Sequence, residues 1–250
     1  MRVRIFEDYE QLSDSAAREL LRQVLVKPHS VLGLATGSSP MGLYEKVSDA
    51  CRRGLVSFAG VHTFNLDEYR GVEPENPLSY HYFMQRNLFR HLDVPPSQVH
   101  IPDGLTQDPE KYCRNYEKDI MEHGGIDLQL LGIGRNGHIG FNEPGEPFGS
   151  GMHLVELHPD TRAANARFFD SPEEVPTQAL TMGIKTICRA RKIFLLASGV
   201  SKAPAIFQTL FGAIREDFPS TVLQLHPDVT LFLDRTAAQE LEPVSSSFEV

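Results

Sequence analysis

The amino-acid sequence predicts the α/β class, with a mostly parallel sheet and helices on both faces. Strand-like and helix-like segments alternate along almost the whole chain, which is the pattern of consecutive βαβ units. Hydrophobic residues make up 41% and charged residues 23% of the 250 residues, a balance that allows a sizeable core. No long Pro/Gly/Ser-rich linker interrupts the chain, so we expect a single domain over residues 1–250.

The first strand and helix carry the clearest local signals. Residues 3–6 read as an opening strand, and Asp8 stands where a helix N-cap is expected, with Gln11 as its capping-box partner. Lys27-Pro28 is expected to end this helix. Between these limits, apolar side chains recur every four positions as a helical stripe: Leu12, Ala16, Leu20 and Val24.

The later elements follow the same alternation. A buried strand is expected at residues 31–35, followed by a helix that Ser39 caps, that Pro40 opens and that runs to Gly54. Further strands are expected at residues 61–66, 98–101, 126–131, 192–197 and 229–234. Further helices are expected at residues 77–92, 108–124, 179–190 and 201–214. In such folds ligands bind at the carboxyl ends of the strands, so the loops that follow the strands are the places to look for a site.

Charge and cysteine content exclude several classes of function. The net charge of −9 and the absence of a basic patch argue against nucleic-acid or anionic-membrane binding. The three cysteines are far apart and odd in number, which favours a reducing, cytoplasmic compartment. The amino terminus has no apolar core of a signal peptide, and no apolar run has the length of a membrane span. A small phosphorylated ligand stays possible, because a local pocket can be positive inside an acidic protein.

The loop after the strand at 31–35 is a candidate anion site. A glycine turn, two hydroxyls and a helix start follow one another there at Gly37, Ser38 and Ser39. Free backbone N–H groups and the helix dipole attract an anion at such a place. The lysine of a P-loop is absent, so a nucleoside triphosphate is not indicated. The alternative is that the two serines only cap the following helix.

Two carboxylates follow the strand at 61–66. A carboxylate held in a cleft can act as a general base when burial or a neighbouring charge raises its pKa, and Asp67 and Glu68 are the candidates. The alternative is a solvated acidic turn or a helix cap.

The glycines Gly132, Gly134 and Gly137 follow the strand at 126–131 with the spacing of a dinucleotide-binding fingerprint. Such a site needs a helix to begin within the glycine run, and the continuation HIGFNEPG makes a helix implausible. We therefore expect a tight loop that carries His138 and Glu143, and no NAD. Imidazole titrates near neutrality and a nearby carboxylate favours its protonated form, so the pair suits proton transfer to and from a sugar oxygen. A structural histidine is the alternative.

Two basic residues, Arg167 and Lys202, remain to be placed. Lys202 stands at an expected helix start, where the dipole disfavours a cation unless an anion binds beside it. The alternative is a solvated surface lysine. The sequence contains no H-E-x-x-H, EF-hand or zinc-finger spacing, so it implies no metal.

Taken together, these stretches resemble the glucosamine-6-phosphate deaminase (isomerase) family. The similar segments run in family order over nearly the whole chain: LGLATGSSPMGLY, FNLDEYRG with NPLSYHYFM, LLGIGRNGHIGFNEPG, TRAANARFF, ALTMGIKTI, SGVSKAPAI and LQLHPDVTLFLD. The resemblance implies a Rossmann-like fold and conversion of glucosamine 6-phosphate and water to fructose 6-phosphate and ammonia. It also implies amino sugar catabolism in the cytoplasm, as in N-acetylglucosamine degradation, with no organic cofactor or metal.

The resemblance also assigns roles by position. Asp67 matches the base that moves a proton from sugar carbon 2 to carbon 1, His138 the acid and base that opens the pyranose ring, and Glu143 the carboxylate that tunes this histidine. The phosphate pocket is matched by five residues: Gly37, Ser38, Ser39, Arg167 and Lys202.

The sequence departs from the family pattern at two places. Many members have an aspartate where this chain has Asn136, so we expect an uncharged amide that holds the imidazole and leaves Glu143 to set the pH dependence of ring opening. Residues 150–155 contain none of the basic residues with which allosteric hexamers bind N-acetylglucosamine 6-phosphate. We therefore expect a non-allosteric enzyme, a monomer or small homo-oligomer.

Three other functions remain open from the sequence. One is a 6-phosphogluconolactonase, which shares the fold and the phosphate loop but does not need Asp67 as an enolisation base. Another is a different aminosugar-phosphate isomerase or deaminase. The third is a sugar-phosphate sensor, which would need none of Asp67, His138 and Glu143.

Overall fold

The computed structural model describes residues 1–157, 162 and 175–241. A large parallel sheet forms its centre, with the strand order β1-β10-β9-β6-β2-β3-β5. Every neighbouring pair in this sheet is parallel. Its strands are β1 (Arg2–Phe6), β2 (Val31–Leu34), β3 (His62–Asn65), β5 (Val99–His100), β6 (Leu128–Leu131), β9 (Ile193–Ala197) and β10 (Val229–Asp234). The predicted fold class is confirmed.

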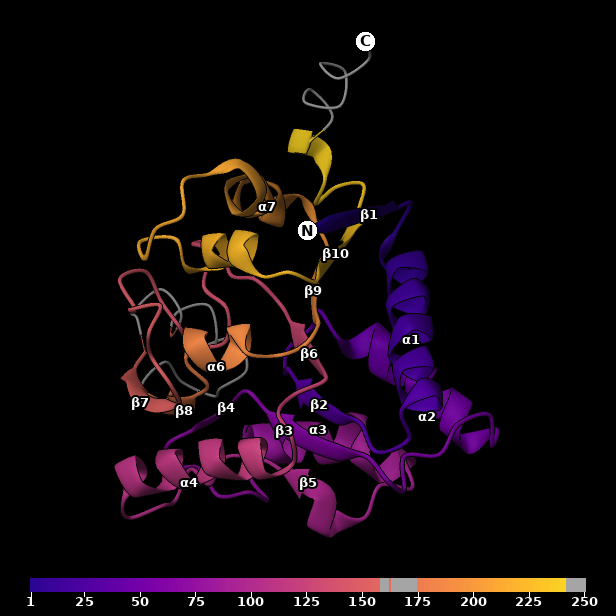
Figure 1. Cartoon of the computed structure of the whole chain (residues 1–250), viewed down its shortest axis with the longest axis vertical. Helices are drawn as coiled ribbons and strands as arrows, with labels where there is room; N and C mark the ends of the chain where they lie inside the picture. The colour runs from indigo at the N-terminus through magenta and orange to yellow at the C-terminus, as the bar shows by residue number, and fades with distance from the viewer. Residues whose placement is uncertain (158–161, 163–174, 242–250) are drawn as a thin grey trace.

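Helices cover both faces of this sheet, as the sequence predicts (Figure 1). One face packs on α1 (Tyr9–Val26), α2 (Met41–Arg52) and α3 (Tyr80–Asn87), and the other on α4 (Pro109–Glu122), α6 (Ile184–Cys188) and α7 (Ala203–Phe211). Short 3₁₀ turns complete the described elements: η1 (Phe89–His91), η2 (Pro96–Gln98), η5 (Val200–Lys202), η6 (Pro219–Leu225) and η7 (Gln239–Leu241). None of the helices described is long and apolar enough to cross a bilayer.

The strands of the large sheet divide their side chains between two cores. In β9, Phe194 and Leu196 join the core under α1 and α2, while Ile193 and Leu195 join the core under α4 and α7. This alternation follows from the two-residue period of a strand, and burial on both faces explains the continuous apolar run.

The predicted start of the first helix is confirmed, and that of the second is off by one residue. Asp8 caps α1 by accepting a 2.8 Å hydrogen bond from the backbone N–H of Gln11. In contrast, α2 begins at Met41 with Pro40 as its N-cap and without a side-chain cap. Ser39 therefore lies in the loop and does not cap the helix.

A second sheet of three antiparallel strands, in the order β4-β8-β7, was not predicted. It comprises β4 (Asp67–Tyr69), β7 (His153–Glu156) and β8 (Gln178–Thr181). The predicted helix at residues 179–190 is therefore wrong in its first part, because residues 179–181 pair with β4 and β7 and only α6 is helical. The predicted acidic loop at Asp67 is likewise a strand, paired with Thr181.

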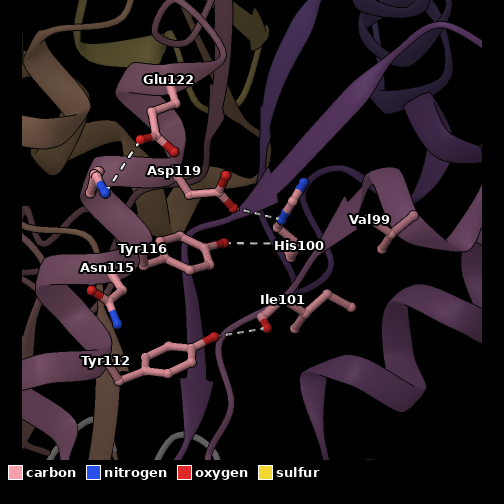
Figure 2. A pocket seen from close by; sticks show the side chains of 9 residues that line it. Val99, His100, Ile101, Tyr112, Asn115, Tyr116, Asp119 and Glu122 are labelled. Carbon is pink, nitrogen blue, oxygen red and sulfur yellow. Dashed lines mark hydrogen bonds and ion pairs between the residues drawn. The ribbon is translucent and has the colours of Figure 1, made fainter.

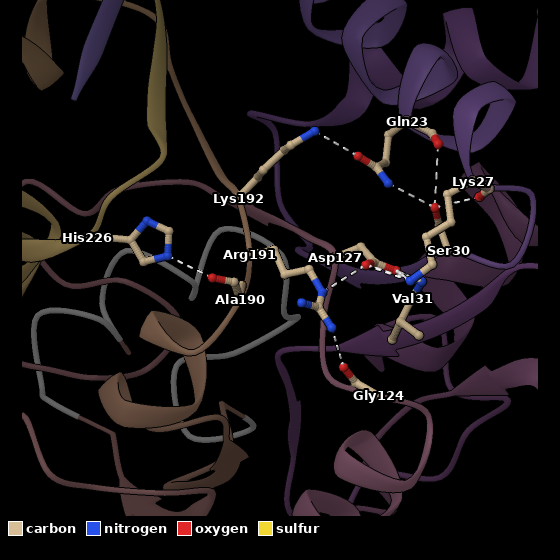
Figure 3. A network of polar contacts seen from close by, with 10 residues as sticks. All are labelled: Gln23, Lys27, Ser30, Val31, Gly124, Asp127, Ala190, Arg191, Lys192 and His226. Carbon is tan, nitrogen blue, oxygen red and sulfur yellow. Dashed lines mark hydrogen bonds and ion pairs between the residues drawn. The ribbon is translucent and has the colours of Figure 1, made fainter.

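A buried carboxylate joins the amino ends of the central strands (Figure 3). Asp127, before β6, is 3% exposed and accepts a 2.8 Å hydrogen bond from the backbone N–H of Val31 in β2. It also pairs with Lys27 after α1 at 2.7 Å and with Arg191 before β9 at 3.2 Å. These contacts join α1, β2 and β9 to the start of β6. They lie at the amino edge of the sheet, opposite to the carboxyl edge that carries the candidate site.

Candidate active site

The candidate site residues follow neighbouring strands at the carboxyl edge of the large sheet. From β2 the chain moves through β3 to β5 at one edge, and it then returns to β6, on the other side of β2, and continues to β9 and β10. The direction of the strand order thus reverses between β2 and β6, and such a reversal opens a crevice where ligands bind. Gly37, Ser38 and Ser39 follow β2, and Gly132 follows β6, so the two loops flank this crevice.

The loop after β2 turns at a glycine and is held in place by Tyr9. Gly37 has a φ of 97°, in the left-handed region that favours glycine. The hydroxyl of Tyr9 donates to the carbonyl oxygens of Ser38 at 2.9 Å and Ser39 at 3.1 Å and accepts from the backbone N–H of Gly42 at 2.8 Å. Tyr9 therefore holds the turn against the first turn of α2. The sequence carries no local signal for this role.

The loops after β2, β6 and β9 meet. A Cβ atom added to Gly132 would lie 3.5 Å from Ser39 Oγ, so these two loops are in contact. Lys202 Nζ, at the start of α7, donates a 2.6 Å hydrogen bond to the carbonyl oxygen of Ile133. Lys202 therefore lies at the loop after β6, which also contacts Ser39. Arg167 lies outside the described residues.

Asp67 is a buried carboxylate with a strongly raised pKa. Asp67 is 6% exposed and occupies the first position of β4. Burial, with a smaller contribution from the neighbouring charge of Glu68, raises the pKa of Asp67 from 3.8 to about 8. A carboxyl group whose pKa lies near neutrality can take up and release a proton at physiological pH, as a general base must.

Glu68, the residue next to Asp67, caps the amino end of α3. Its carboxylate accepts hydrogen bonds of 2.8–2.9 Å from the backbone N–H groups of Tyr69, Tyr80 and His81. Burial raises the pKa of Glu68 to about 7, although these three donors oppose the rise. The helix-cap alternative therefore holds for Glu68, and the solvated acidic turn is wrong for both carboxylates.

His138, Glu143 and Asn136 lie together in the glycine loop. His138 Nδ1 is 3.4 Å from Glu143 Oε2, and the same oxygen accepts a 2.7 Å hydrogen bond from Asn136 Nδ2. Asn136 Oδ1 accepts a 3.2 Å hydrogen bond from the backbone N–H of His138. The expectation that the Asn136 amide holds the imidazole is therefore corrected. Its two polar atoms are engaged by the carboxylate and the backbone, and the ring faces Glu143.

The glycine loop itself is not helical. Residues 132–152, all described, contain no helix, and β7 is the next regular element. The helix that would hold a pyrophosphate is therefore missing, and the predicted tight loop is confirmed. Gly134 serves packing instead, because a Cβ atom there would lie 2.3 Å from the ring of His138.

The second sheet connects this loop to Asp67. Thr181 in β8 pairs with Asp67, and its Oγ1 accepts a 3.1 Å hydrogen bond from the backbone N–H of Phe141. The buried Asn142 Nδ2 donates 2.8 Å hydrogen bonds to the carbonyl oxygens of Ile139 and Met182. Sequence reasoning used Asn142 only as a helix breaker and missed Thr181. No local pattern in the sequence indicates these roles, because each depends on a contact with a segment 40 residues away.

The arrangement combines three chemical capacities at the carboxyl edge of the large sheet. Asp67 can act as a base, and its Oδ2 would lie 3.6 Å from a Cβ atom added to Gly140 of the glycine loop. The His138–Glu143 pair can donate or accept a proton. The turn at Gly37–Ser39 with Lys202 can hold an anion. A buried base, an acid and an anion site at the switch point of a parallel sheet define an α/β acid–base enzyme.

Comparison with known proteins gives the family. Residues 7–232 match the family described as glucosamine-6-phosphate isomerases/6-phosphogluconolactonase, so the chain belongs to this family. The chain is 51% identical to glucosamine-6-phosphate deaminase of Halothermothrix orenii, over 96% of this chain and 100% of the relative. It is 52% identical to that of Thermoanaerobacter pseudethanolicus, over 95% of this chain and 94% of the relative.

Solved structures agree with this assignment. A structure of a monomeric glucosamine-6-phosphate deaminase has a TM-score of 0.93 and 49% identity, and the match covers 96% of this chain and 99% of that chain. The 6-phosphogluconolactonase of Trypanosoma brucei has a TM-score of 0.79 and 19% identity over 96% of this chain and 98% of that one. At that identity the second likeness shows the shared fold alone.

Proposed function

We propose that the protein is a glucosamine-6-phosphate deaminase, which converts glucosamine 6-phosphate and water to fructose 6-phosphate and ammonia. The observation that carries this proposal is the buried Asp67, whose pKa is raised to about 8 beside the glycine loop. A phosphogluconolactonase, which hydrolyses an ester, has no need of a base to move a proton between two sugar carbons. Two relatives named glucosamine-6-phosphate deaminase, 51% and 52% identical to this chain, support the same choice.

Ring opening is the proposed task of His138. The imidazole accepts the proton of the hydroxyl at carbon 1 and gives one to the ring oxygen, so the pyranose opens without net proton change. Glu143, 3.4 Å from Nδ1, stabilises the charged ring between these transfers. Asn136 holds Glu143 in place by its 2.7 Å hydrogen bond and is a positioning residue.

Isomerisation is the proposed task of Asp67. Its carboxylate removes the proton at carbon 2 of the open sugar and returns it to carbon 1, while a proton passes from the amino group to the oxygen at carbon 1, which leaves an imine at carbon 2. Water then adds to the imine, and ammonia leaves as the ketone forms. The carboxylate is regenerated in each cycle, and these steps use neither a redox cofactor nor a metal ion.

The phosphate group of the substrate is proposed to bind at the far end of the crevice. Gly37 shapes the turn there, Ser38 and Ser39 supply hydroxyls and backbone N–H groups, and Lys202 supplies positive charge. Arg167 is proposed for the same pocket on the resemblance alone. Binding energy gained at this remote group orients the sugar for the two proton transfers.

We further propose that the enzyme acts as a single-domain, non-allosteric monomer in the cytoplasm. The monomer is supported by the likeness to a monomeric deaminase and by the lack of Arg and Lys in residues 150–155. The three cysteines are free, as a reducing compartment would leave them.

The proposal is tested by offering the protein two substrates. Ammonia and fructose 6-phosphate are expected in equal amounts from glucosamine 6-phosphate, with no rate above background on 6-phosphogluconolactone. Lactone hydrolysis without ammonia release would replace the deaminase by the lactonase. No turnover of either compound, together with binding of both, would favour a sugar-phosphate sensor.

A further inference from the structure

Three histidines gather at the edge of the large sheet, outside the proposed active site. His62 begins β3, His100 ends the edge strand β5, and His123 follows the last residue of α4. The ring centroids of His62 and His123 are 4.1 Å apart, those of His100 and His123 5.6 Å, and those of His62 and His100 5.9 Å. Three separate elements therefore bring their imidazoles to one place.

The register of the strands explains why the rings converge. His100 lies opposite Phe64 in the parallel β3–β5 pair, and its ring stacks on that of Phe64 with centroids 4.2 Å apart. His62 is two residues before Phe64, so it points to the same face of the sheet. The helix α4 covers this face, since the hydroxyl of Tyr116 donates a 3.1 Å hydrogen bond to the carbonyl oxygen of His100.

The nitrogens of the cluster are arranged for a ligand. One ring nitrogen from each histidine lies within 4.8 Å of the other two. His62 Nδ1 and His100 Nε2 are buried without a hydrogen-bond partner among the residues described. A buried polar atom without a partner is unfavourable, and a shared cation would satisfy both nitrogens at once.

Asp119 prepares two of the rings as metal ligands. Its carboxylate lies 3.1 Å from His100 Nδ1 and 3.2 Å from His123 Nδ1, and its carbonyl oxygen is 2.8 Å from His123 Nδ1 (Figure 2 shows the contact with His100). These acceptors favour a proton on Nδ1 of both rings, which leaves each Nε2 with a free lone pair. A carboxylate behind the ligating imidazole is the usual outer shell of a histidine-bound metal.

One histidine of the cluster borders a hollow that is open to solvent. His100 and Asp119 line an open hollow of about 450 Å³, bordered by side chains of α4 such as Tyr112, Tyr116 and Glu122 (Figure 2). The His100 and His123 side chains are 20% and 28% exposed. The hollow therefore reaches the cluster at His100, and a water molecule can fill the remaining coordination position of a bound ion.

We propose that His62, His100 and His123 bind one divalent transition-metal ion, of which zinc is the best match, and that this ion fastens α4 to the sheet edge. Three neutral imidazoles suit zinc, which takes a water as its fourth ligand. Zinc–nitrogen bonds of about 2.0–2.1 Å require nitrogens roughly 3.3 Å apart, so the rings draw together by small side-chain rotations. The ion is structural, because β3 begins at the cluster and only its far end adjoins Asp67.

Local sequence motifs cannot reveal such a site. The histidines are spread over 62 residues and three elements, so no metal-binding spacing exists along the chain. The sequence implies no metal because it contains no known metal-binding spacing and the expected reaction needs none. The proposed ion takes no part in that reaction.

The test is metal binding to the whole protein after removal of metals by a chelator. Titration with Zn²⁺ by calorimetry is expected to give one site per chain, and Co²⁺ is expected to give the visible absorption of a four-coordinate ion. One equivalent of Zn²⁺ is expected to raise the melting temperature by several degrees, in line with linkage of binding to folding. Activity is not the readout, so this result is independent of the proposed function.

Single substitutions test whether the ion binds to this cluster and not to other histidines of the chain. His123→Gln is expected to abolish stoichiometric binding and the thermal shift, and His62→Gln serves equally if the first variant folds poorly. Asp119→Asn is expected to weaken binding about 10–100-fold. His91→Gln, in η1 and outside the cluster, is the matched control and is expected to bind like the wild type. No stoichiometric binding by the wild type, or equal loss in His91→Gln, would overturn the proposal.

Discussion

At the scale of single residues, the burial that raises the pKa of Asp67 also lowers the stability of the folded protein at neutral pH. The folded protein holds its pKa at about 8, against 3.8 for the ordinary carboxyl group. The unfolded chain therefore releases this proton at lower pH than the folded protein does. Stability contributed by the protonated group is full below about pH 4 and is lost as pH rises toward 8.

Asp67→Asn is accordingly expected to make the protein more stable at neutral and alkaline pH. The amide does not titrate, so the gain in unfolding free energy over wild type should grow between pH 4 and pH 8 and reach the order of a few kcal/mol. Urea unfolding of both proteins at pH 5 and pH 8.5 measures this difference. A difference that does not change with pH would contradict the raised pKa.

Asn136→Asp is expected to shift the pH dependence of catalysis. The substitution places a carboxylate where an amide N–H group now lies 2.7 Å from Glu143 Oε2. The added negative charge near the imidazole favours its protonated form, whereas ring opening begins with the neutral imidazole, so the acid limb of kcat/KM should move upward by about one pH unit. A pH profile that coincides with the wild type would show that the Glu143 environment does not control ring opening.

The residues proposed to carry the chemistry have a clearer sequence signal than those that position them. Asp67, His138 and Glu143 are titratable and follow strands, which is a signal visible in the sequence. Tyr9, Thr181 and Asn142 act through hydrogen bonds to segments 29–40 residues away, and their types are common in other settings. Only the folded chain shows these contacts.

At the scale of elements, the glycine loop depends on close packing around His138. A side chain at Gly134 would come within 2.3 Å of the imidazole, so the ring would have to move. Gly134→Ala is expected to reduce kcat about 10–100-fold, since small displacements of a catalytic group have such effects.

Gly149→Ala is the matched control for this prediction. It changes a glycine further along the same chain segment, at a position where an added Cβ atom meets nothing within 4 Å. Steady-state kinetics of both variants, with melting temperatures to confirm folding, make the comparison. Equal activity in the two variants would show that the His138 ring is not confined by Gly134.

The parallel sheet was predictable and the small antiparallel sheet was not. Strands such as β2, β6 and β9 are buried, mostly apolar runs, and the parallel arrangement follows from the helices between them. The strands of the second sheet have only three or four residues, and β4 and β8 are far apart in the sequence. Their pairing overrides the helical pattern of residues 179–183. At Gly183 a Cβ atom would lie 2.1 Å from the carbonyl oxygen of Gly151, so close backbone packing requires glycine before α6 begins.

At the scale of the whole molecule, the site exists because of the strand order. The loops after β2, β6 and β9 and the strand β4 come from four distant parts of the chain, and the reversal between β2 and β6 brings them to one crevice. The sequence singles out these loops as the proposed site, and the topology explains why they lie at one edge of the sheet.

The whole molecule is also expected to lack allosteric control. Residues 150–155 contain no Arg or Lys, and the ring of His153 lies 2.9 Å from the carbonyl oxygen of Gly151 and 3.4 Å from Glu146. The rate should depend hyperbolically on glucosamine 6-phosphate, with no activation by N-acetylglucosamine 6-phosphate, and light scattering should give the mass of a monomer. A sigmoidal curve that this ligand relieves would contradict the expectation.

The most direct test of the central claim is ammonia release from glucosamine 6-phosphate by wild type and Asp67→Asn side by side. Asp14→Asn, which alters an exposed pair with Arg18, is the control for the same chemical change at the surface. We expect release by the wild type and the control, and a loss of about 10²–10⁴-fold in Asp67→Asn, the contribution of a general base. A rate in Asp67→Asn within a few-fold of wild type, or no ammonia from the wild type, would contradict the account.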